Sequence, residues 1–448
     1  MHKSGGEVSF WSAVAMGIGA MVGAGIFALL GQAGLIAGSA VWLSFVAGGV
    51  IALLSGYSMG RLGARFPSSG GLVEYLVQGY DEGVFSGAIS VMMYLASLVS
   101  ISLIARTFGS YAYEMLPAAA PQVLVEIFAA AIILIFMALN LRGPGSVARA
   151  ENVVVFVKMT ALGIFAIAGL VTMDPARLSP AHYPPVHMVF FSLAITFFAY
   201  EGFRIITNAA EDMPDPARSL PRAIMTSIAL VMVLYVCVAF AVFGNLSAVE
   251  VVKAQDFALA EAARPAFGAA GFTIMALAAL LSTSSAINAS LYAVTNVTYR
   301  LARLGELPCE FGKPVAHSRQ GLVISSAAII LMAVLFDLSS IAVIGAISTL
   351  VIHMIVHIGH LRLLDKTGAS RWMVLTAIGV NLAAVILAVI YLSGKRPGIL
   401  IWIIGFFAAA FVIEIVLRAL TGRVVVRRIG NHAGVPVNKA PAPGITGR

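Results

Sequence analysis

The chain has 448 residues, of which 60% are hydrophobic and 11% are charged, and its net charge is +8. A soluble domain carries roughly 25% charged residues, so a water-exposed globular protein is excluded. The apolar residues come in blocks of about 20, the length that crosses a hydrocarbon core about 30 Å thick. Because helices satisfy their backbone polar groups internally, we expect an all-α polytopic membrane protein.

Hydropathy along the chain predicts twelve membrane-spanning helices. They lie at residues 10–34, 41–62, 84–112, 120–140, 152–173, 186–210, 220–244, 267–302, 321–336, 339–362, 372–393 and 398–420. If the N-terminus is cytoplasmic, 20 of the 28 Lys and Arg residues lie in cytoplasmic segments and six in external ones. The positive-inside rule describes this asymmetry. We therefore expect a plasma-membrane protein with both termini in the cytoplasm and anionic lipids as partners.

The first predicted span is rich in glycine. Its segment GIGAMVGAGIF contains Gly17, Gly19, Gly23 and Gly25. Each glycine costs a helix about 1 kcal/mol relative to alanine. The run therefore indicates either a break in the helix or close packing against a neighbouring helix, which small residues permit.

The fifth span contains Lys158, about two turns from its start. A charged lysine at depth costs at least about 2.5–3.5 kcal/mol. Burial disfavours the ammonium form, so Lys158 is a candidate proton carrier. The alternative is a side chain that extends to the cytoplasmic interface.

The sixth span, FFAYEGFRIITNAAEDMPDP, contains Gly202 between Glu201 and Arg204. The two charged residues can pair at their i, i+3 spacing, or they can contact a substrate or form a gate. Interrupted helices five spans apart indicate a five-plus-five repeat. Since five is odd, the second set runs opposite to the first, as in transporters that bind substrate at broken helices.

This repeat divides the chain into five predicted regions. They are a cytoplasmic N-terminus (1–9), a first inverted repeat (10–173), a second inverted repeat (186–362), two further helices (372–420) and a cytoplasmic tail (421–448). The external loop 245–267 mixes charged and apolar residues, and it is expected to form a short helix over the outer face.

Two polar clusters lie in later spans. The eighth span contains Ser282, Thr283, Ser284 and Ser285, whose hydroxyl groups can bond to their own helix carbonyls, to a lysine or to a small cation. The tenth ends in VIHMIVHIGH. Packing at the interface is the favoured interpretation of these histidines, and a metal site is disfavoured because no carboxylate or cysteine is near in sequence.

Three segments together resemble the amino acid–polyamine–organocation transporters. They are GIGAMVGAGIF, FFAYEGFRIITNAAEDMPDPARSLPRAI and INASLYAVTNVTYRLARLGELP. Within this superfamily the chain resembles the archaeal proton-coupled amino acid transporters of broad specificity. The resemblance implies the leucine-transporter fold: ten core helices in two inverted repeats, plus two more.

The resemblance also implies a substrate site at the two breaks. Backbone amides after Met21 would bind the substrate carboxylate, and carbonyls of the sixth span would bind its amino group. Phe198 would also act as a gate. The matching positions are Met21, Ala24, Gly25, Ile26, Ser97, Phe198, Ala199, Glu201 and Gly202.

In sodium-coupled members of the superfamily a cation lies between spans one, five and eight. The resemblance implies that the ammonium of Lys158 replaces this ion, beside Thr283 and Ser284. Glu201 and Arg204 depart from the pattern of the relatives. The Glu201 carboxylate either favours cationic substrates or neutralises Arg204.

The function expected from the sequence is therefore a proton-coupled amino acid symporter that works by alternating access, without enzyme activity, cofactor or metal. An amino acid/amine exchanger and a potassium importer on the same scaffold are the alternatives within transport. A receptor or an intramembrane enzyme is disfavoured, because no signalling domain or catalytic set of residues is evident. The sequence specifies neither the amino acid nor the oligomeric state.

Overall fold

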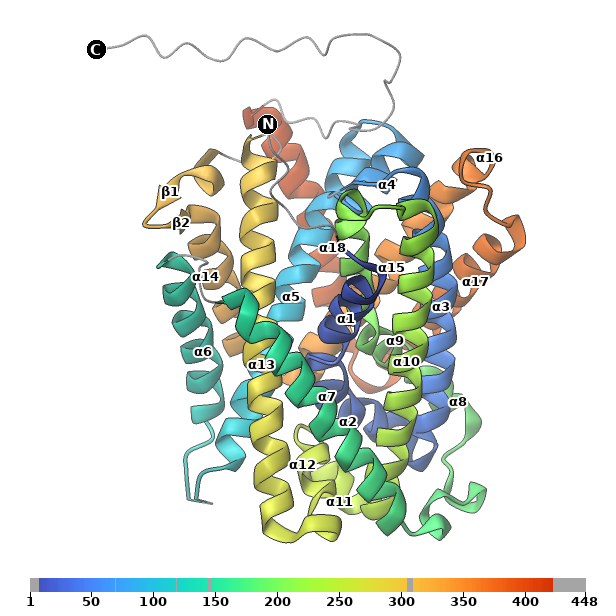
Figure 1. Ribbon diagram of the computed structural model, residues 1–448, viewed down its shortest axis with the longest axis vertical. Helices are drawn as coiled ribbons and strands as arrows, with labels where there is room; N and C mark the ends of the chain where they lie inside the picture. Colours follow the sequence, from blue (N-terminus) through green and yellow to red (C-terminus); the bar gives the residue numbers. More distant parts are fainter. Residues whose placement is uncertain (1–7, 69, 118, 143–146, 304–308, 422–448) are drawn as a thin grey trace.

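The computed structural model describes residues 8–68, 70–117, 119–142, 147–303 and 309–421. Within these ranges nine helices are long and apolar enough to cross a membrane, and two shorter apolar helices accompany them. Figure 1 shows most of them side by side along the long axis of the molecule. The prediction of an all-α polytopic membrane protein is confirmed. The count of twelve crossings and the five-plus-five repeat stay predictions.

Helical segments occupy all twelve predicted ranges. The first half contains α1 (Phe10–Met21), α2 (Ala24–Ala37), η1 (Gly38–Ala40), α3 (Val41–Arg65), α4 (Leu72–Tyr80), α5 (Val84–Glu114), α6 (Leu124–Leu141), α7 (Val147–Thr172), η2 (Pro175–Leu178), η3 (Pro180–His182), α8 (Val186–Phe191), α9 (Leu193–Ala199) and η4 (Glu201–Asp212).

The second half begins with α10 (Pro216–Asn245), α11 (Ala248–Lys253), α12 (Ala258–Ala262), α13 (Arg264–Arg303) and η5 (Cys309–Gly312). It continues with β1 (Pro314–Val315), β2 (Ser318–Arg319), α14 (Gln320–Leu335), α15 (Leu338–His360), η6 (Leu361–Leu363), α16 (Leu364–Thr367), α17 (Arg371–Lys395) and α18 (Pro397–Thr421). The two strands form an antiparallel hairpin. The predicted tail lies outside the described residues, apart from the last residue of α18.

Local sequence signals fix several helix starts. Asp215 and Asp337 accept hydrogen bonds from the backbone at the starts of α10 and α15. Ser247 and Glu250 form a capping box at α11. These side chains satisfy amides that have no partner within the helix. The helix expected in the loop 245–267 is confirmed, and the loop contains two short helices, α11 and α12.

Small residues bring α3 and α10 into close contact. A Cβ at Gly56 would approach Ile224 and Ile228, and one at Gly60 would approach Pro221. Small side chains allow membrane helices to pack at short distance. Since α3 also contacts α9 and α15, this packing holds the interior helices in place.

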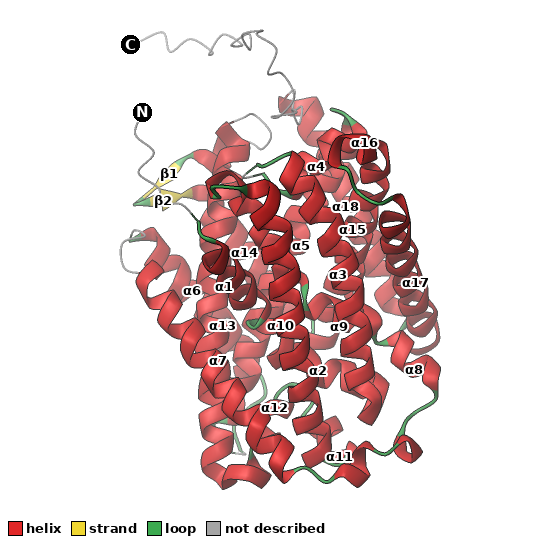
Figure 2. Cartoon of the chain, turned by 45° about the vertical axis from the view of Figure 1, so that its right-hand side comes forward, coloured by secondary structure: helices red, strands yellow, loops and turns green. Residues whose placement is uncertain are grey.

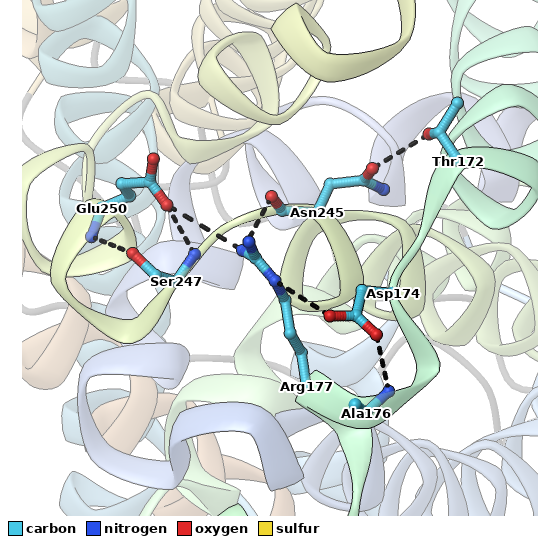
Figure 3. Close-up of polar contacts among 7 residues, drawn as sticks. All are labelled: Thr172, Asp174, Ala176, Arg177, Asn245, Ser247 and Glu250. Atoms are coloured by element: carbon cyan, nitrogen blue, oxygen red, sulfur yellow. Dashed lines mark hydrogen bonds and ion pairs between the residues drawn. The ribbon is translucent and has the colours of Figure 1, made fainter.

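The bundle has two distinct ends. Figure 2 shows α4 and α16 at one end, which we call the α4 end, and α11 at the other, which we call the α11 end. At the α11 end, Arg177 donates to the carbonyl of Asn245 at 3.0 Å and lies 4.0 Å from the carboxylate of Glu250 (Figure 3). This cluster ties the segment after α7 to the turn between α10 and α11.

Candidate functional site

Two helices are interrupted at the middle of the bundle. α1 ends at Met21, and α2 begins at Ala24 after Gly23, whose φ of −91° and ψ of −95° are not helical. α9 ends at Ala199, and the chain continues as the 3₁₀ helix η4. Breaks of this kind leave amides and carbonyls without partners in their own helix. Both lie where the sequence predicted interrupted helices.

The two breaks are in direct contact. A Cβ at Gly202 would collide with the backbone of Ala20 and Met21, and one at Gly25 would collide with the carbonyl of Ala199. Glycine is therefore required at both positions for the two segments to cross. The glycines of the first span serve close packing as well as the break, so the two interpretations of that run hold together.

Tyr235 of α10 joins the breaks. Its hydroxyl lies 2.7 Å from the carbonyl oxygen of Met21 and 3.3 Å from that of Ala199. The ring is fully buried and packs against Phe45 and Tyr200. Sequence reasoning missed Tyr235, because a tyrosine in an apolar span gives no signal of which carbonyl it reaches.

A cavity of about 930 Å³ borders both breaks and extends to the α4 end. At that end Trp11 and Val73 line it. The predicted site residues that line it are Met21, Gly25, Ser97, Lys158, Phe198, Ala199, Glu201, Gly202 and Arg204. The structure therefore brings nine predicted residues, from six helical segments, to one space.

The other predicted site residues, Ala24, Ile26, Thr283 and Ser284, are described by their own surroundings. Ala24 begins α2, and Ile26 is fully buried beside it. Thr283 donates to carbonyls of its own helix, at 2.7 Å to Ala279 and 3.1 Å to Leu280. Ser284 is half-buried, and the hydroxyl residue of that cluster that lines the cavity is Ser285.

Lys158 points into the bundle. Its side chain is 1% exposed, and its Nζ donates to the carbonyl oxygen of Gly19 at 2.7 Å. On the other side of the break, Ser282 of α13 donates to the carbonyl of Val22 at 2.9 Å. Polar side chains from α7 and α13 thus hold the interrupted end of α1 from two directions. The interfacial alternative for Lys158 is wrong.

Glu201 and Arg204 form an ion pair at the cavity wall. Arg204 Nε lies 2.5 Å from Glu201 Oε1, and its Nη2 donates to the Ser97 hydroxyl at 3.2 Å. The second carboxylate oxygen of Glu201 lies 3.0 Å from Nε2 of His353 on α15. The carboxylate is therefore shared between an arginine and a histidine, and the histidine was not a predicted site residue.

The three histidines of the tenth span are not at an interface. His353, His357 and His360 are all fully buried. The interpretation of interfacial packing is wrong, because α15 lies inside the bundle between α5, α9, α17 and α18. A local sequence pattern does not distinguish the end of a lipid-exposed helix from that of a buried one.

Comparison with known proteins agrees with this architecture. The sequence pattern of the amino acid permease family matches residues 8–419. The chain is 36% identical to the inner membrane transport protein YbaT of Escherichia coli, over 92% of this chain and 96% of that protein. It is also 36% identical to an uncharacterized protein of Methanocaldococcus jannaschii, over 94% and 98%. A methylthioribose transporter of Bacillus subtilis is 28% identical over 66% of this chain and 67% of its own.

Proposed function

The chain belongs to the amino acid permease family, and from this premise we propose that it is a proton-coupled amino acid symporter with its substrate site at the two helix breaks. It is a membrane transporter and not an enzyme. The observation that carries the proposal is the bond from buried Lys158 to the interrupted end of α1. Alternating access around a midplane site is the mode of transport that broken helices support.

The start of α2 supplies the site for the substrate carboxylate. The backbone amides of Ala24, Gly25 and Ile26 are the first of that helix, and Gly25 lines the cavity. A helix N-terminus carries a partial positive charge and unpaired amides, which favour anions. The carbonyls of Phe198, Ala199 and Glu201 at the other break would bind the amino group. Among these carbonyls, that of Ala199 also lies 3.3 Å from the hydroxyl of Tyr235.

The charges around the cavity favour substrates with uncharged side chains. Among the described residues that line it, Lys158, Glu201 and Arg204 are ionisable as cation or carboxylate. Because the Glu201 carboxylate is paired with Arg204 at 2.5 Å, it neutralises the arginine. Of the two roles that the sequence left open for Glu201, the structure supports this one. We propose zwitterionic, neutral amino acids as the substrate class.

Proton coupling would operate through Lys158. A protonated ammonium donates to Gly19 and links α7 to α1. Loss of the proton weakens this bond, because a charged donor forms the stronger hydrogen bond. If substrate and proton both stabilise the same conformation, each raises the affinity for the other. Within this coupling site, Ser282 is the residue of α13 that donates a hydrogen bond to the end of α1. Thr283 and Ser284 follow it directly in the sequence, and we propose for them no more than a supporting role.

The conformation is one that opens toward the α4 end. At the α11 end, Gln32 donates to Asp256 at 2.7 Å, and the backbone of Gln255 lies against Gly31. The loop between α11 and α12 thus covers α2. With the N-terminus in the cytoplasm, as the distribution of basic residues favours, this is an inward-facing state of a plasma-membrane protein. The broken segments α1–α2 and α9–η4 would be equivalent helices of the two proposed repeats.

The test is uptake of labelled neutral amino acids into proteoliposomes in sodium-free buffer, with and without an inward proton gradient. We compare the wild type with Lys158→Ala and with Lys253→Ala, an exposed lysine of α11 as the control. We expect the gradient to stimulate the wild type and the control. Lys158→Ala should keep substrate binding and lose the response.

Other outcomes would contradict the proposal. Uptake that requires sodium, or that requires an internal amino acid, identifies another coupling ion or an exchanger. Rubidium uptake without amino acid uptake identifies an ion importer. An equal response in Lys158→Ala and wild type removes the lysine from the coupling mechanism.

A further inference from the structure

Three buried histidines follow one another along α15 and take no part in the proposed transport cycle. His353, His357 and His360 are each 0% exposed. Buried polar groups are costly unless they are hydrogen-bonded. Their partners are therefore informative about what the cluster does.

His357 and His360 belong to one hydrogen-bonded chain. His357 Nε2 lies 3.1 Å from the Ser55 hydroxyl and its Nδ1 lies 2.9 Å from the Ser58 hydroxyl. The Ser58 hydroxyl lies 2.8 Å from Nδ1 of His360, whose Nε2 lies 2.9 Å from the hydroxyl of Thr367. Thr367 is half-buried at the end of α16. The chain thus runs from the interior to the α4 end.

The donor-to-acceptor direction along this series of hydrogen bonds follows from the partners at its two ends. Asn381 Nδ2 donates to Ser55 at 3.2 Å, and the hydroxyl of Thr367 donates to the carbonyl of Leu363 at 3.0 Å. The proton of Ser55 then goes to His357 Nε2. Since a neutral imidazole has one donor and one acceptor nitrogen, His357 carries its proton on Nδ1. It donates to Ser58, and Ser58 donates to His360. Every donor in the chain has one acceptor.

His353 connects this chain to the cavity. Its Nε2 lies 3.0 Å from Glu201 Oε2 but outside hydrogen-bond geometry, and its Nδ1 also has no hydrogen-bond partner among the described residues. The ring packs edge-on against Phe197 and Phe203, and its centroid lies 6.1 Å from that of His357. The imidazole of His353 is therefore in contact with the Glu201 carboxylate, and its ring neighbours that of His357 without a hydrogen bond between them.

Few other ionisable groups approach the histidines. Among the described residues, Glu201 of η4 is the charged group within contact distance of them. α3 contributes serines, α9 contributes a phenylalanine ring and α17 contributes an asparagine. Tyr80 of α4 donates to the carbonyl of Ile355, and Arg362 stacks on its ring. A proton on the histidine chain thus has Glu201 as its nearest counter-charge.

We propose that His353, His357, Ser58 and His360 form a proton path between Glu201 in the cavity and the α4 end, with His353 as its switch. This inference rests on the proposed proton coupling and adds a second protonatable site to it. The path lies within the bundle, separate from the cavity mouth. A proton can therefore leave Glu201 while a substrate still occupies the cavity.

Each transfer exchanges one N–H or O–H bond for another. His353 takes its proton from the Glu201 carboxyl, turns away from it and gives the proton to Nε2 of His357, from which the Ser55 hydroxyl has rotated away. The Nδ1 proton of His357 moves to Ser58, the Ser58 proton moves to Nδ1 of His360, and the Nε2 proton of His360 leaves at Thr367. One proton enters and one leaves, and rotation of the hydroxyl groups and rings resets the chain. With His353 against Glu201 the path is interrupted, which prevents a continuous leak.

The experiment uses Ser58→Ala, which removes the hydroxyl between two histidines and leaves every charge in place. Ser44→Ala is the control, because Ser44 is an equally buried serine on the same helix that bonds to Val189 and Ser192. Proteoliposomes contain the pH dye pyranine. Proton entry and uptake of labelled neutral amino acids under a proton gradient are measured together with exchange against internal unlabelled amino acid.

We expect Ser58→Ala to lose proton entry and gradient-driven uptake at least tenfold, while exchange stays within twofold of wild type. His360→Asn, which keeps a hydrogen-bonding group but passes no proton, should behave alike, and it replaces Ser58→Ala if that variant does not fold. A responsive wild type with unchanged Ser58→Ala overturns the proton path alone. Equal loss of exchange and driven uptake shows a structural role and also overturns it. A wild type that ignores the gradient contradicts the proposed function itself.

Discussion

The hydroxyl of Tyr235 lies 2.7 Å from the carbonyl oxygen of Met21, the last residue of α1 before its break. The same hydroxyl lies 3.3 Å from the carbonyl of Ala199, the last residue of α9. One side chain thus links the interrupted ends of two helices. Any movement that separates the breaks must break one of these contacts.

Replacement of Tyr235 by phenylalanine tests this link. A buried carbonyl left without a partner costs about 1–3 kcal/mol, and about 1.4 kcal/mol corresponds to a factor of ten. We expect amino acid uptake by Tyr235→Phe to fall roughly tenfold. The matched control is Tyr111→Phe, a fully buried tyrosine bonded to the carbonyl of Phe27 within α2 and not to the interrupted end of α1 or α9. Equal activity of both variants and wild type would show that the link has no part in transport.

Gly202→Ala should abolish uptake. Its new Cβ would collide with the backbone of Ala20 and Met21, which has no room to move away from a crossing helix segment. Gly379→Ala on α17 is the control, because nothing lies within 4 Å of a Cβ there. That variant should transport normally, since alanine is the better helix former by about 1 kcal/mol. Labelled uptake and thermal unfolding in detergent distinguish a lost site from a lost fold.

Arg204→Ala should change which amino acids are carried. It leaves the Glu201 carboxylate at the cavity without the arginine that lies 2.5 Å away. We expect the ratio of lysine to alanine uptake to rise about tenfold, as a new ion pair of about 1.4 kcal/mol would give. The double variant Glu201→Gln/Arg204→Gln, which has no net change in charge, should keep the preference for neutral substrates. If the ratio stays constant in both, the pair does not set selectivity.

Asp256 predicts a pH dependence of stability. Burial raises the pKa of this carboxyl above its ordinary value of 3.8, while Arg106 and the hydrogen bond from Gln32 oppose the increase. The folded protein thus holds this proton to a higher pH than the unfolded chain. Its contribution to the free energy of unfolding therefore falls as pH rises from about 4 toward neutrality. We expect the Tm of Asp256→Asn minus that of wild type to increase over this range.

Glu250 provides the opposite case at the same end of the bundle. Hydrogen bonds from the Ser247 side chain and backbone hold its pKa below the ordinary 4.5. Its stabilising contribution is present above that pH and is lost as pH falls through the lowered pKa. The Tm of Glu250→Gln should therefore be lower than that of wild type at neutral pH, by a small amount because the side chain is exposed. A difference that does not shrink on acidification would contradict the assignment.

Much of the architecture was readable from local sequence. Blocks of apolar residues predicted the helices because the cost of placing polar groups in hydrocarbon acts on each segment separately. The glycines of the first span and the Glu201–Arg204 segment predicted the two breaks because helix propensity is also local. Lys158 was singled out for the same reason, since a cation in an apolar run is conspicuous without knowledge of its neighbours.

What lies across from each residue was decided by the tertiary structure alone. Tyr235 and Met21 are 214 residues apart, and Ser58 and His360 are 302 apart. The hydroxyl of Ser282, and not that of Thr283, turned out to bond the end of α1 because a rotation of about 100° between successive helical residues decides which one faces the partner. The sequence determined which segments are apolar enough to enter the membrane and where their helices are interrupted. The packing of α7, α10, α13 and α15 around the breaks determined which polar groups meet. These contacts join segments that are far apart in the sequence, and sequence separation does not indicate distance in the folded protein.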